Sequence, residues 1–160
     1  MNIFDYALQM EKDGESYYRE IAQKTSNEGL QTILTMLADE EFKHYQAIDR
    51  MRQDKYQMTD TTVLDESKSI FIEMKEQGER FEPEQEQAEL YKRAQEIEKK
   101  SQQFYHEKAR QADIDDQKKL FERLAKEEEK HYFLLENIIA FVSRPKQWLE
   151  NAEWYHLEEY

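Results

Sequence analysis

Apolar residues recur along this chain in alternating steps of three and four, which is the spacing of the buried face of an α-helix. Four such stripes are present, and each suits a helix of about 25 residues. The first consists of Phe4, Leu8, Glu11, Glu15, Tyr18 and Ala22, and the others cover residues 34–51, 91–109 and 121–138. Three glycines and two prolines are too few for a sheet protein with many turns. The pattern therefore predicts an all-α fold.

Short turns connect the stripes in pairs. The turn Thr25–Gly29, with Ser26 or Asn27 as the N-cap, joins the first two helices. The acidic turn Asp113–Asp116 can cap the fourth helix. A short turn makes its two helices antiparallel neighbours, so we expect two helical hairpins, at about residues 2–53 and 86–142.

The segment between the hairpins, residues 54–85, is long enough to run the length of a bundle and return. It has room for a helix at Asp65–Gln77 that Gly78 ends. Two antiparallel hairpins joined by one long crossover form a ferritin-like four-helix bundle. The tail contains a short amphipathic helix, whose Trp148 and Trp154 cover a bundle end or a partner subunit. The expected limits are residues 1–142 for the bundle and 143–160 for the tail.

Composition narrows the classes of function. The net charge is −13 from 36 acidic and 23 basic residues, which opposes binding to nucleic acid or anionic lipid and attracts cations. Eight Phe, ten Tyr and two Trp argue against a disordered chain. Without cysteine there is no disulfide, thiolate metal site or iron–sulfur cluster. No apolar run suits a membrane span or a signal peptide, so we expect a cytoplasmic protein.

The two halves of the chain repeat at an offset of 87 residues, and the best matches are polar residues on the buried stripes. Glu11 falls on Glu98, Tyr18 on Tyr105, Glu41 on Glu128 and His44 on His131. A carboxylate in a bundle core costs several kcal/mol unless it is paired or bound to metal. The two Glu-x-x-His motifs place a carboxylate and an imidazole on one helical face, one turn apart. With one Glu from each of the other two helices, they form the ligand set of a dimetal site.

We therefore expect six metal ligands, and a carboxylate-rich set favours iron, with manganese as an alternative. The six are Glu11, Glu41, His44, Glu98, Glu128 and His131. Glu15 is an alternative to Glu11, but its repeat partner is Gln102 rather than a carboxylate. The alternative is a duplicated helical hairpin whose Glu and His side chains face solvent and bind no metal. In that case the buried stripe of each of the four helices would be interrupted at the same height in the bundle.

Other polar residues near the motifs have two readings each. Tyr18 and Tyr105 follow their Glu by two helical turns, so each hydroxyl either bonds a ligand carboxylate and takes part in catalysis, or belongs to an ordinary core aromatic. His106 and His156 are expected at the surface. The acids beside the motifs are expected to form a solvated face, with a route for cations as the alternative; they are Glu40, Glu127 and Glu129.

With these motifs in place, residues 3–142 resemble the ferritin-like diiron domain of the rubrerythrin family. The local sequence also resembles that family, in ALQMEKDGESYYREIAQKT followed by LADEEFKHYQAI and in EIEKKSQQFYHEKA followed by LAKEEEKHYFLL. The resemblance implies that Glu41 and Glu128 bridge two metal ions and that Glu11 and Glu98 are terminal ligands. It also implies that His44 and His131 bind one metal each. Family members reduce hydrogen peroxide, or use oxygen or peroxide to oxidise Fe(II).

Two departures from the family pattern bear on function. Rubrerythrins proper carry a four-cysteine rubredoxin-type domain that supplies electrons, whereas this chain has no cysteine. Electrons would then come from a separate rubredoxin-like protein or flavoprotein. The family also has an additional carboxylate three residues after the third-helix ligand, where this chain has Ser101, with Gly14 as its repeat partner. This weakens the peroxidase assignment but not the dimetal site, and the two small residues suggest room for a diatomic molecule.

The expected function is thus a non-haem dimetal oxidoreductase, a peroxidase or ferroxidase. An iron-storage subunit resembling bacterioferritin and a non-catalytic metal-binding helical module are the alternatives. A homodimer is expected, and the long crossover permits exchange of hairpins between two subunits.

Overall fold

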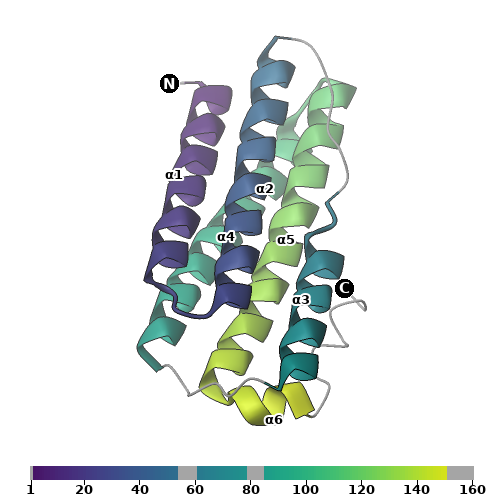
Figure 1. The fold of residues 1–160 in the computed structure, drawn as a ribbon. Helices are drawn as coiled ribbons and strands as arrows, with labels where there is room; N and C mark the ends of the chain where they lie inside the picture. Colours follow the sequence, from purple (N-terminus) through teal and green to yellow (C-terminus); the bar gives the residue numbers. More distant parts are fainter. Residues whose placement is uncertain (1, 54–60, 79–84, 151–160) are drawn as a thin grey trace.

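The computed structural model describes residues 2–53, 61–78 and 85–150, and within these ranges the chain forms six helices and no strand (Figure 1). The helices are α1 Ile3–Lys24, α2 Glu28–Arg52, α3 Val63–Gln77, α4 Gln85–Gln111, α5 Asp115–Ser143 and α6 Pro145–Glu150. None of them is both long and apolar enough to cross a membrane.

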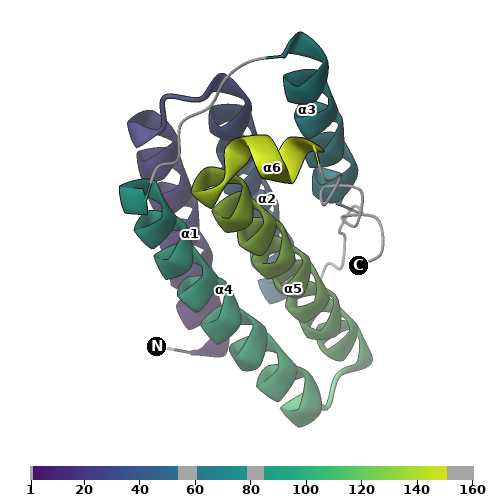
Figure 2. The same cartoon turned by 90° about the horizontal axis from the view of Figure 1, so that it is seen from below.

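Four of the helices form the bundle. Helix α1 packs along α2, and α4 packs along α5, so each pair is an antiparallel hairpin. The hairpins meet through α1 with α4 and through α2 with α5. The view along the bundle in Figure 2 shows these four helices side by side, with α3 outside them. The predicted all-α, ferritin-like bundle of two hairpins with one crossover and a short C-terminal helix is confirmed.

The helix ends follow local sequence signals. Asn2 accepts a hydrogen bond from the Asp5 amide at 2.9 Å, and Asn27 rather than Ser26 caps α2, through the Leu30 amide at 2.9 Å. Helix α3 ends at Gly78, which has φ 63° in the left-handed region where glycine is favoured. The predicted acidic cap of α5 is different: Ile114 is the N-cap and makes no side-chain bond. Asp115 and Asp116 lie instead in the first turn, where their negative charges interact favourably with the positive end of the helix dipole.

Helices α3 and α6 cover one part of the bundle. Helix α3 packs on α2 and α6, and α6 runs across the end of the bundle (Figure 2). Trp148 on α6 is fully buried, with its ring centroid 4.6 Å from that of Phe71 and 5.7 Å from that of Phe141. Helix α3 also lies close to Gly29, since a Cβ there would lie 2.0 Å from the Met74 methyl carbon and the flexible end of that side chain would have to move. Trp154 and the rest of the tail lie outside the described residues.

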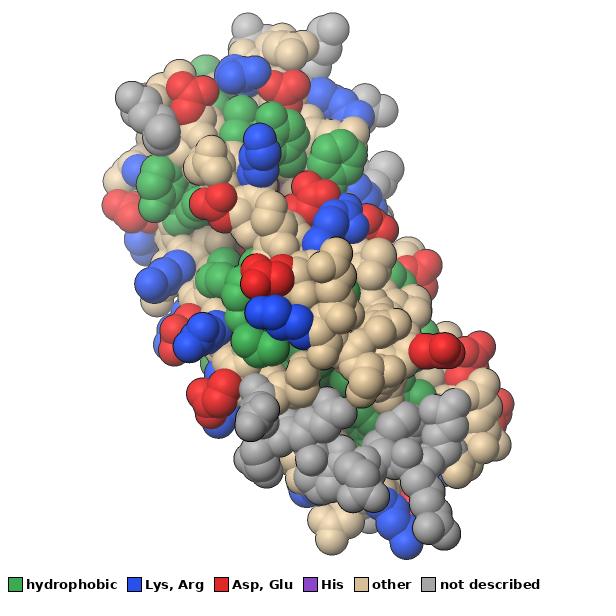
Figure 3. All heavy atoms as spheres, turned by 60° about the vertical axis from the view of Figure 1, so that its left-hand side comes forward, with side chains coloured by type: hydrophobic (Ala, Val, Ile, Leu, Met, Phe, Trp, Pro, Cys, Tyr) green, Lys and Arg blue, Asp and Glu red, His purple; other side chains and the backbone are tan. Residues whose placement is uncertain are grey.

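The core consists of two hydrophobic clusters. The larger one contains Leu34, Leu134 and Trp148, and the smaller one contains Leu8 and Phe121. On each bundle helix the polar stripe residues stand between members of the two clusters, for example between Leu8 and Tyr18 on α1. A polar layer therefore divides an otherwise apolar core. The outer face in Figure 3 carries acidic and basic side chains dispersed over the helices.

Candidate metal centre

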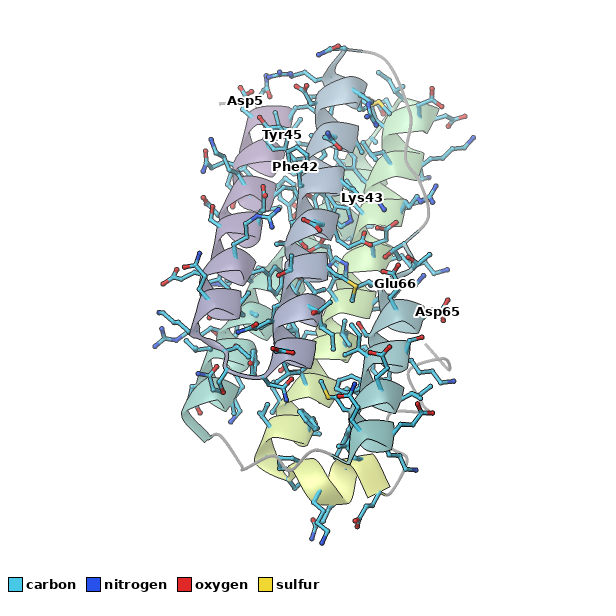
Figure 4. All side chains as sticks on the ribbon, viewed as in Figure 1. Asp5, Phe42, Lys43, Tyr45, Asp65 and Glu66 are labelled. Atoms are coloured by element: carbon cyan, nitrogen blue, oxygen red, sulfur yellow. The ribbon has the colours of Figure 1, made fainter. Side chains whose placement is uncertain are left out.

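The six predicted ligand side chains converge in this polar layer. Glu11 comes from α1, Glu98 from α4, and the two Glu-x-x-His pairs from α2 and α5, and each of the six is at most 3% exposed. Between the two motif residues on α2, Phe42 faces outward: it is 43% exposed and its ring stacks on that of the partly buried Tyr45 (Figure 4). The spacing of three residues is thus what points both members of a motif inward.

Each histidine presents the same ring nitrogen to carboxylates from two other helices. His44 Nδ1 lies 2.8 Å from Glu128 Oε1 and 3.4 Å from Glu11 Oε2. His131 Nδ1 lies 3.1 Å from Glu41 Oε1 and 3.5 Å from Glu98 Oε1. The two imidazole rings are nearly parallel, with centroids 5.6 Å apart and an interplanar angle of 8°. The arrangement repeats the near-twofold relation of the two hairpins.

The donor atoms fall into two groups of four, in each of which all atoms lie within 4.8 Å of one another. One group is Glu11, Glu41, His44 and Glu128, and the other is Glu41, Glu98, Glu128 and His131. Glu41 and Glu128 belong to both groups. Two cations held side by side by two shared carboxylates would use this geometry.

The unsatisfied atoms in the layer fit such cations. His44 Nδ1, Glu11 Oε2, Glu98 Oε2 and Glu128 Oε1 are buried and make no hydrogen bond among the described residues. The close approach of His44 Nδ1 to Glu128 Oε1 does not have the angles of a hydrogen bond. Buried polar atoms without partners are costly, and an oxygen-rich set with two imidazoles suits iron or manganese. The residues present therefore fit a dimetal centre.

Gly14 makes room for one of the shared carboxylates. A Cβ on Gly14 would lie 3.1 Å from Glu41 Oε2 and 3.5 Å from Glu41 Cδ. The space that the sequence suggested for a diatomic molecule beside Gly14 is thus occupied by Glu41. Its repeat partner, Ser101, is 7% exposed.

Crowding of four carboxylates divides their pKa values into two pairs. Burial and the neighbouring carboxylates, Glu11 foremost for Glu41 and Glu98 foremost for Glu128, raise the pKa of Glu41 and of Glu128 well above the ordinary value. Burial also opposes ionisation of the other two. For Glu11, burial is the largest single influence, but the charge of His44 together with hydrogen bonds to Glu41, His44 and Tyr105 lowers the pKa. For Glu98, hydrogen bonding to Glu128 and the charge of His131 lower the pKa to about 2. Without metal, the shared carboxylates are therefore the ones that hold protons.

Both tyrosines donate to a ligand carboxylate on the opposite hairpin. The Tyr105 hydroxyl donates to Glu11 Oε1 at 2.5 Å, and the Tyr18 hydroxyl donates to Glu98 Oε1. Both side chains are buried, and burial followed by the nearby carboxylate raises the pKa of each well above its ordinary value. The hydroxyls are thus held in the protonated, donating form. Sequence spacing placed them on the correct face but did not show that each reaches across to the other hairpin.

Glu40 and Glu127 correct the expectation of a solvated acidic face. They are 7% and 4% exposed, and Glu127 Oε1 lies 2.9 Å from His44 Nε2, whereas Glu128 approaches Nδ1 of the same ring. Glu129, by contrast, is only partly buried. The two buried acids are repeat partners at the same offset of 87, and that match was the signal in the sequence that could have revealed them.

The remaining alternatives lie outside the centre. Glu15 pairs with Arg19, with 2.6 Å between carboxylate oxygen and guanidinium nitrogen, and its side chain is 24% exposed. His106 is exposed, and His156 lies outside the described residues.

Comparison with known families gives one match: the family model described as Rubrerythrin matches residues 2–139. No curated protein and no solved structure matches this sequence.

Proposed function

The chain belongs to the rubrerythrin family, whose members bind a dimetal centre, and on that premise we propose that it is a diiron oxidoreductase. It reduces hydrogen peroxide or oxygen and oxidises Fe(II) in the process. The observation that carries this proposal is the pair of four-residue donor groups that share Glu41 and Glu128 in the buried polar layer. Either group alone would support a single metal ion, whereas the shared carboxylates favour two.

The chain's own residues have distinct roles in this proposal. Glu11 and His44 would hold one metal ion, Glu98 and His131 would hold the other, and Glu41 and Glu128 would contribute to both positions. When bound, two iron ions together supply two electrons, which matches the requirement of peroxide reduction. Manganese fits the same donor set and is the alternative metal.

The surroundings prepare the ligands for this task. Tyr18 and Tyr105 donate hydrogen bonds that orient Glu98 and Glu11 and satisfy one oxygen of each. The two hydrophobic clusters on either side of the layer keep bulk water away from the carboxylates. The protons on Glu41 and Glu128 in the metal-free state must leave when these groups bind metal.

Electrons are proposed to come from a separate donor, a rubredoxin-like protein or a flavoprotein. The reason is that the chain contains no cysteine and therefore cannot bind a rubredoxin-type iron of its own. Ser101 stands where the family pattern has an additional carboxylate, so the ligand set is symmetric between the two metal positions. We also propose that two copies of the chain form a homodimer.

The proposal is tested by loading the metal-free protein with Fe(II) under anaerobic conditions and following oxidation at matched concentrations of hydrogen peroxide or oxygen. Oxidation of two Fe(II) for each peroxide consumed is expected, and a much faster reaction with peroxide than with oxygen would indicate a peroxidase. Glu129→Gln, which removes a carboxylate next to a ligand, serves as the matched control and should react as the unmodified protein does. Oxidation by neither reagent would contradict the proposal.

A further inference from the structure

The two histidine ligands differ in what holds them from behind. His44 Nε2 lies 2.9 Å from Glu127 Oε1, whereas His131 Nε2 makes no hydrogen bond among the described residues. Glu40 is the repeat partner of Glu127 and would be the corresponding acceptor for His131. The inner ligands are therefore symmetric, but their outer support is not.

Glu40 is close enough to support His131 but is bound elsewhere. One of its carboxylate oxygens lies within 4.8 Å of a ring nitrogen of His131. Its Oε1 instead accepts a hydrogen bond from the Thr61 hydroxyl at 2.7 Å. Its Oε2 faces Lys43 Nζ at 3.8 Å, beyond hydrogen-bond distance, and has no hydrogen-bond partner among the described residues.

Thr61 provides this restraint on one side only. It lies just before α3, in the crossover segment that stands outside the repeat. Among the described residues, the side chain of Glu127 contacts His44 and Arg123 and no hydroxyl. On the other side, Glu127 Oε2 lies 3.6 Å from Arg123 Nε, so that Glu127 is restrained in its position beside His44. Met36 is the repeat partner of Arg123 and offers no such charge.

A carboxylate behind a metal-binding histidine changes the ligand itself. With Nδ1 directed at the cation, Nε2 carries the proton and donates it to the carboxylate, which fixes the tautomer and makes Nδ1 a stronger ligand. Loss of such a partner typically costs about 10–100-fold in metal affinity. His44 has this support and His131 does not.

We propose that the two metal positions are inequivalent, and that Thr61 is a positioning residue that keeps the His131 position the weaker one by holding Glu40 away from His131. The inference rests on the dimetal centre proposed above. It requires that the position of Glu11 and His44 fills first, and that releasing Glu40 strengthens the position of Glu98 and His131.

The test is a titration of the metal-free protein with Co(II) under anaerobic conditions, followed by visible absorption and by competition with a chelator. Repulsion between two cations separates the binding steps even in a symmetric centre. Each position is therefore measured alone, in His131→Gln for the His44 position and in His44→Gln for the His131 position. The Co(II) affinity of the His44 position, measured in His131→Gln, is expected to be at least about tenfold higher than that of the His131 position, measured in His44→Gln. Equal affinities in the two variants would overturn the proposal.

The role of Thr61 is tested by adding Thr61→Val to each single-position variant. Thr61→Val should raise the Co(II) affinity about tenfold in the His44→Gln background and leave it unchanged in the His131→Gln background. Glu127→Gln should lower the affinity only in the His131→Gln background. Thr35→Val, at an exposed threonine on α2, is the matched control, and Thr61→Ser should behave as the parent. No gain from Thr61→Val, in protein with an unchanged melting temperature, would overturn the role of Thr61. Absence of Co(II) binding in the unmodified protein would refute the dimetal centre itself.

Discussion

Hairpin α1–α2 and hairpin α4–α5 contribute matching side chains to the polar layer. The first brings Glu11, Glu41 and His44, and the second brings Glu98, Glu128 and His131. Even the tyrosine bonds are exchanged symmetrically, from each hairpin to the terminal carboxylate of the other. The hairpins differ one layer further out, where Glu127 contacts His44 but Glu40 contacts Thr61.

This comparison shows where a duplicated sequence is constrained. The residues proposed as metal ligands have the same identity in both halves, and either half alone supplies only part of each donor group. Residues behind the histidines are the same type in both halves, yet their contacts have diverged with the segments packed outside them. Symmetry of ligand identity therefore does not ensure symmetry of ligand strength.

The largest expected effect comes from neutralising a shared carboxylate, which should damage both hairpins' metal positions at once. Glu41→Gln and Glu128→Gln should each lower the affinity for both metals by more than about 100-fold, since even partners outside the ligand set cost 10–100-fold. The metal-free variants should melt no lower than the unmodified protein, because one buried acid is removed from a crowded layer. Calorimetric titration and thermal melting measure both quantities. Loss of only one metal in either variant would contradict sharing.

Removing the metal should lower the melting temperature, because the proposed metal ions bind side chains from both hairpins. At metal concentrations about 1,000 times the dissociation constant, binding stabilises the fold by about 4 kcal/mol, or on the order of 10 °C in melting temperature. Thermal melting before and after chelation measures the shift. Identical melting curves would mean that the layer is satisfied without metal.

Raising the pH should strengthen metal binding. Glu41 and Glu128 have raised pKa values and are protonated in the metal-free protein, while metal binding requires them ionised. Protons are then released on binding, so the apparent affinity increases by about tenfold per pH unit for each proton released, over the range in which these carboxylates stay protonated in the metal-free protein. Titration in two buffers of different ionisation enthalpy counts the protons. An affinity that falls as the pH rises would contradict the pKa directions.

Removing the tyrosine hydroxyls should affect the two metal positions in a crossed manner. Tyr105→Phe leaves Glu11 Oε1 without its donor and should weaken the His44 position about tenfold, whereas Tyr18→Phe should weaken the His131 position through Glu98. Measured in the single-position variants, each change should leave the other position within about twofold. An effect on the tyrosine's own hairpin instead would contradict the crossed bonds.

The smallest expected effect is the difference in metal affinity between alanine substitutions at Gly14 and at its repeat partner, Ser101. Gly14→Ala introduces a Cβ 3.1 Å from Glu41 Oε2, so the carboxylate must shift by a few tenths of an ångström and metal affinity should fall several-fold. The same change gains up to about 1 kcal/mol of helix propensity in the metal-free protein. Ser101→Ala adds no atom and should leave affinity unchanged. A fall in metal-free stability with normal affinity would assign Gly14 to packing alone.

Much of the fold could be predicted from the sequence because its signals are local or repeated. The stripes, the short turns and Gly78 predicted the hairpins and the end of α3, and the Glu-x-x-His spacing predicted which side chains face inward. The expectation for Glu40 and Glu127 was wrong because their burial depends on how the hairpins pack against each other. The contact of Glu40 with Thr61 depends on a crossover without repeat or periodicity. Such contacts between distant segments are set by tertiary packing and leave no local pattern.

The central claim is that one chain holds two metal ions in its polar layer. It is tested most directly by metal analysis of the metal-free protein after anaerobic loading with Fe(II) and removal of unbound iron, alongside the double variant Glu41→Gln, Glu128→Gln. The account predicts about two iron ions per chain in the unmodified protein and almost none in the variant. Less than one iron per chain, or equal iron content in both proteins, would contradict it.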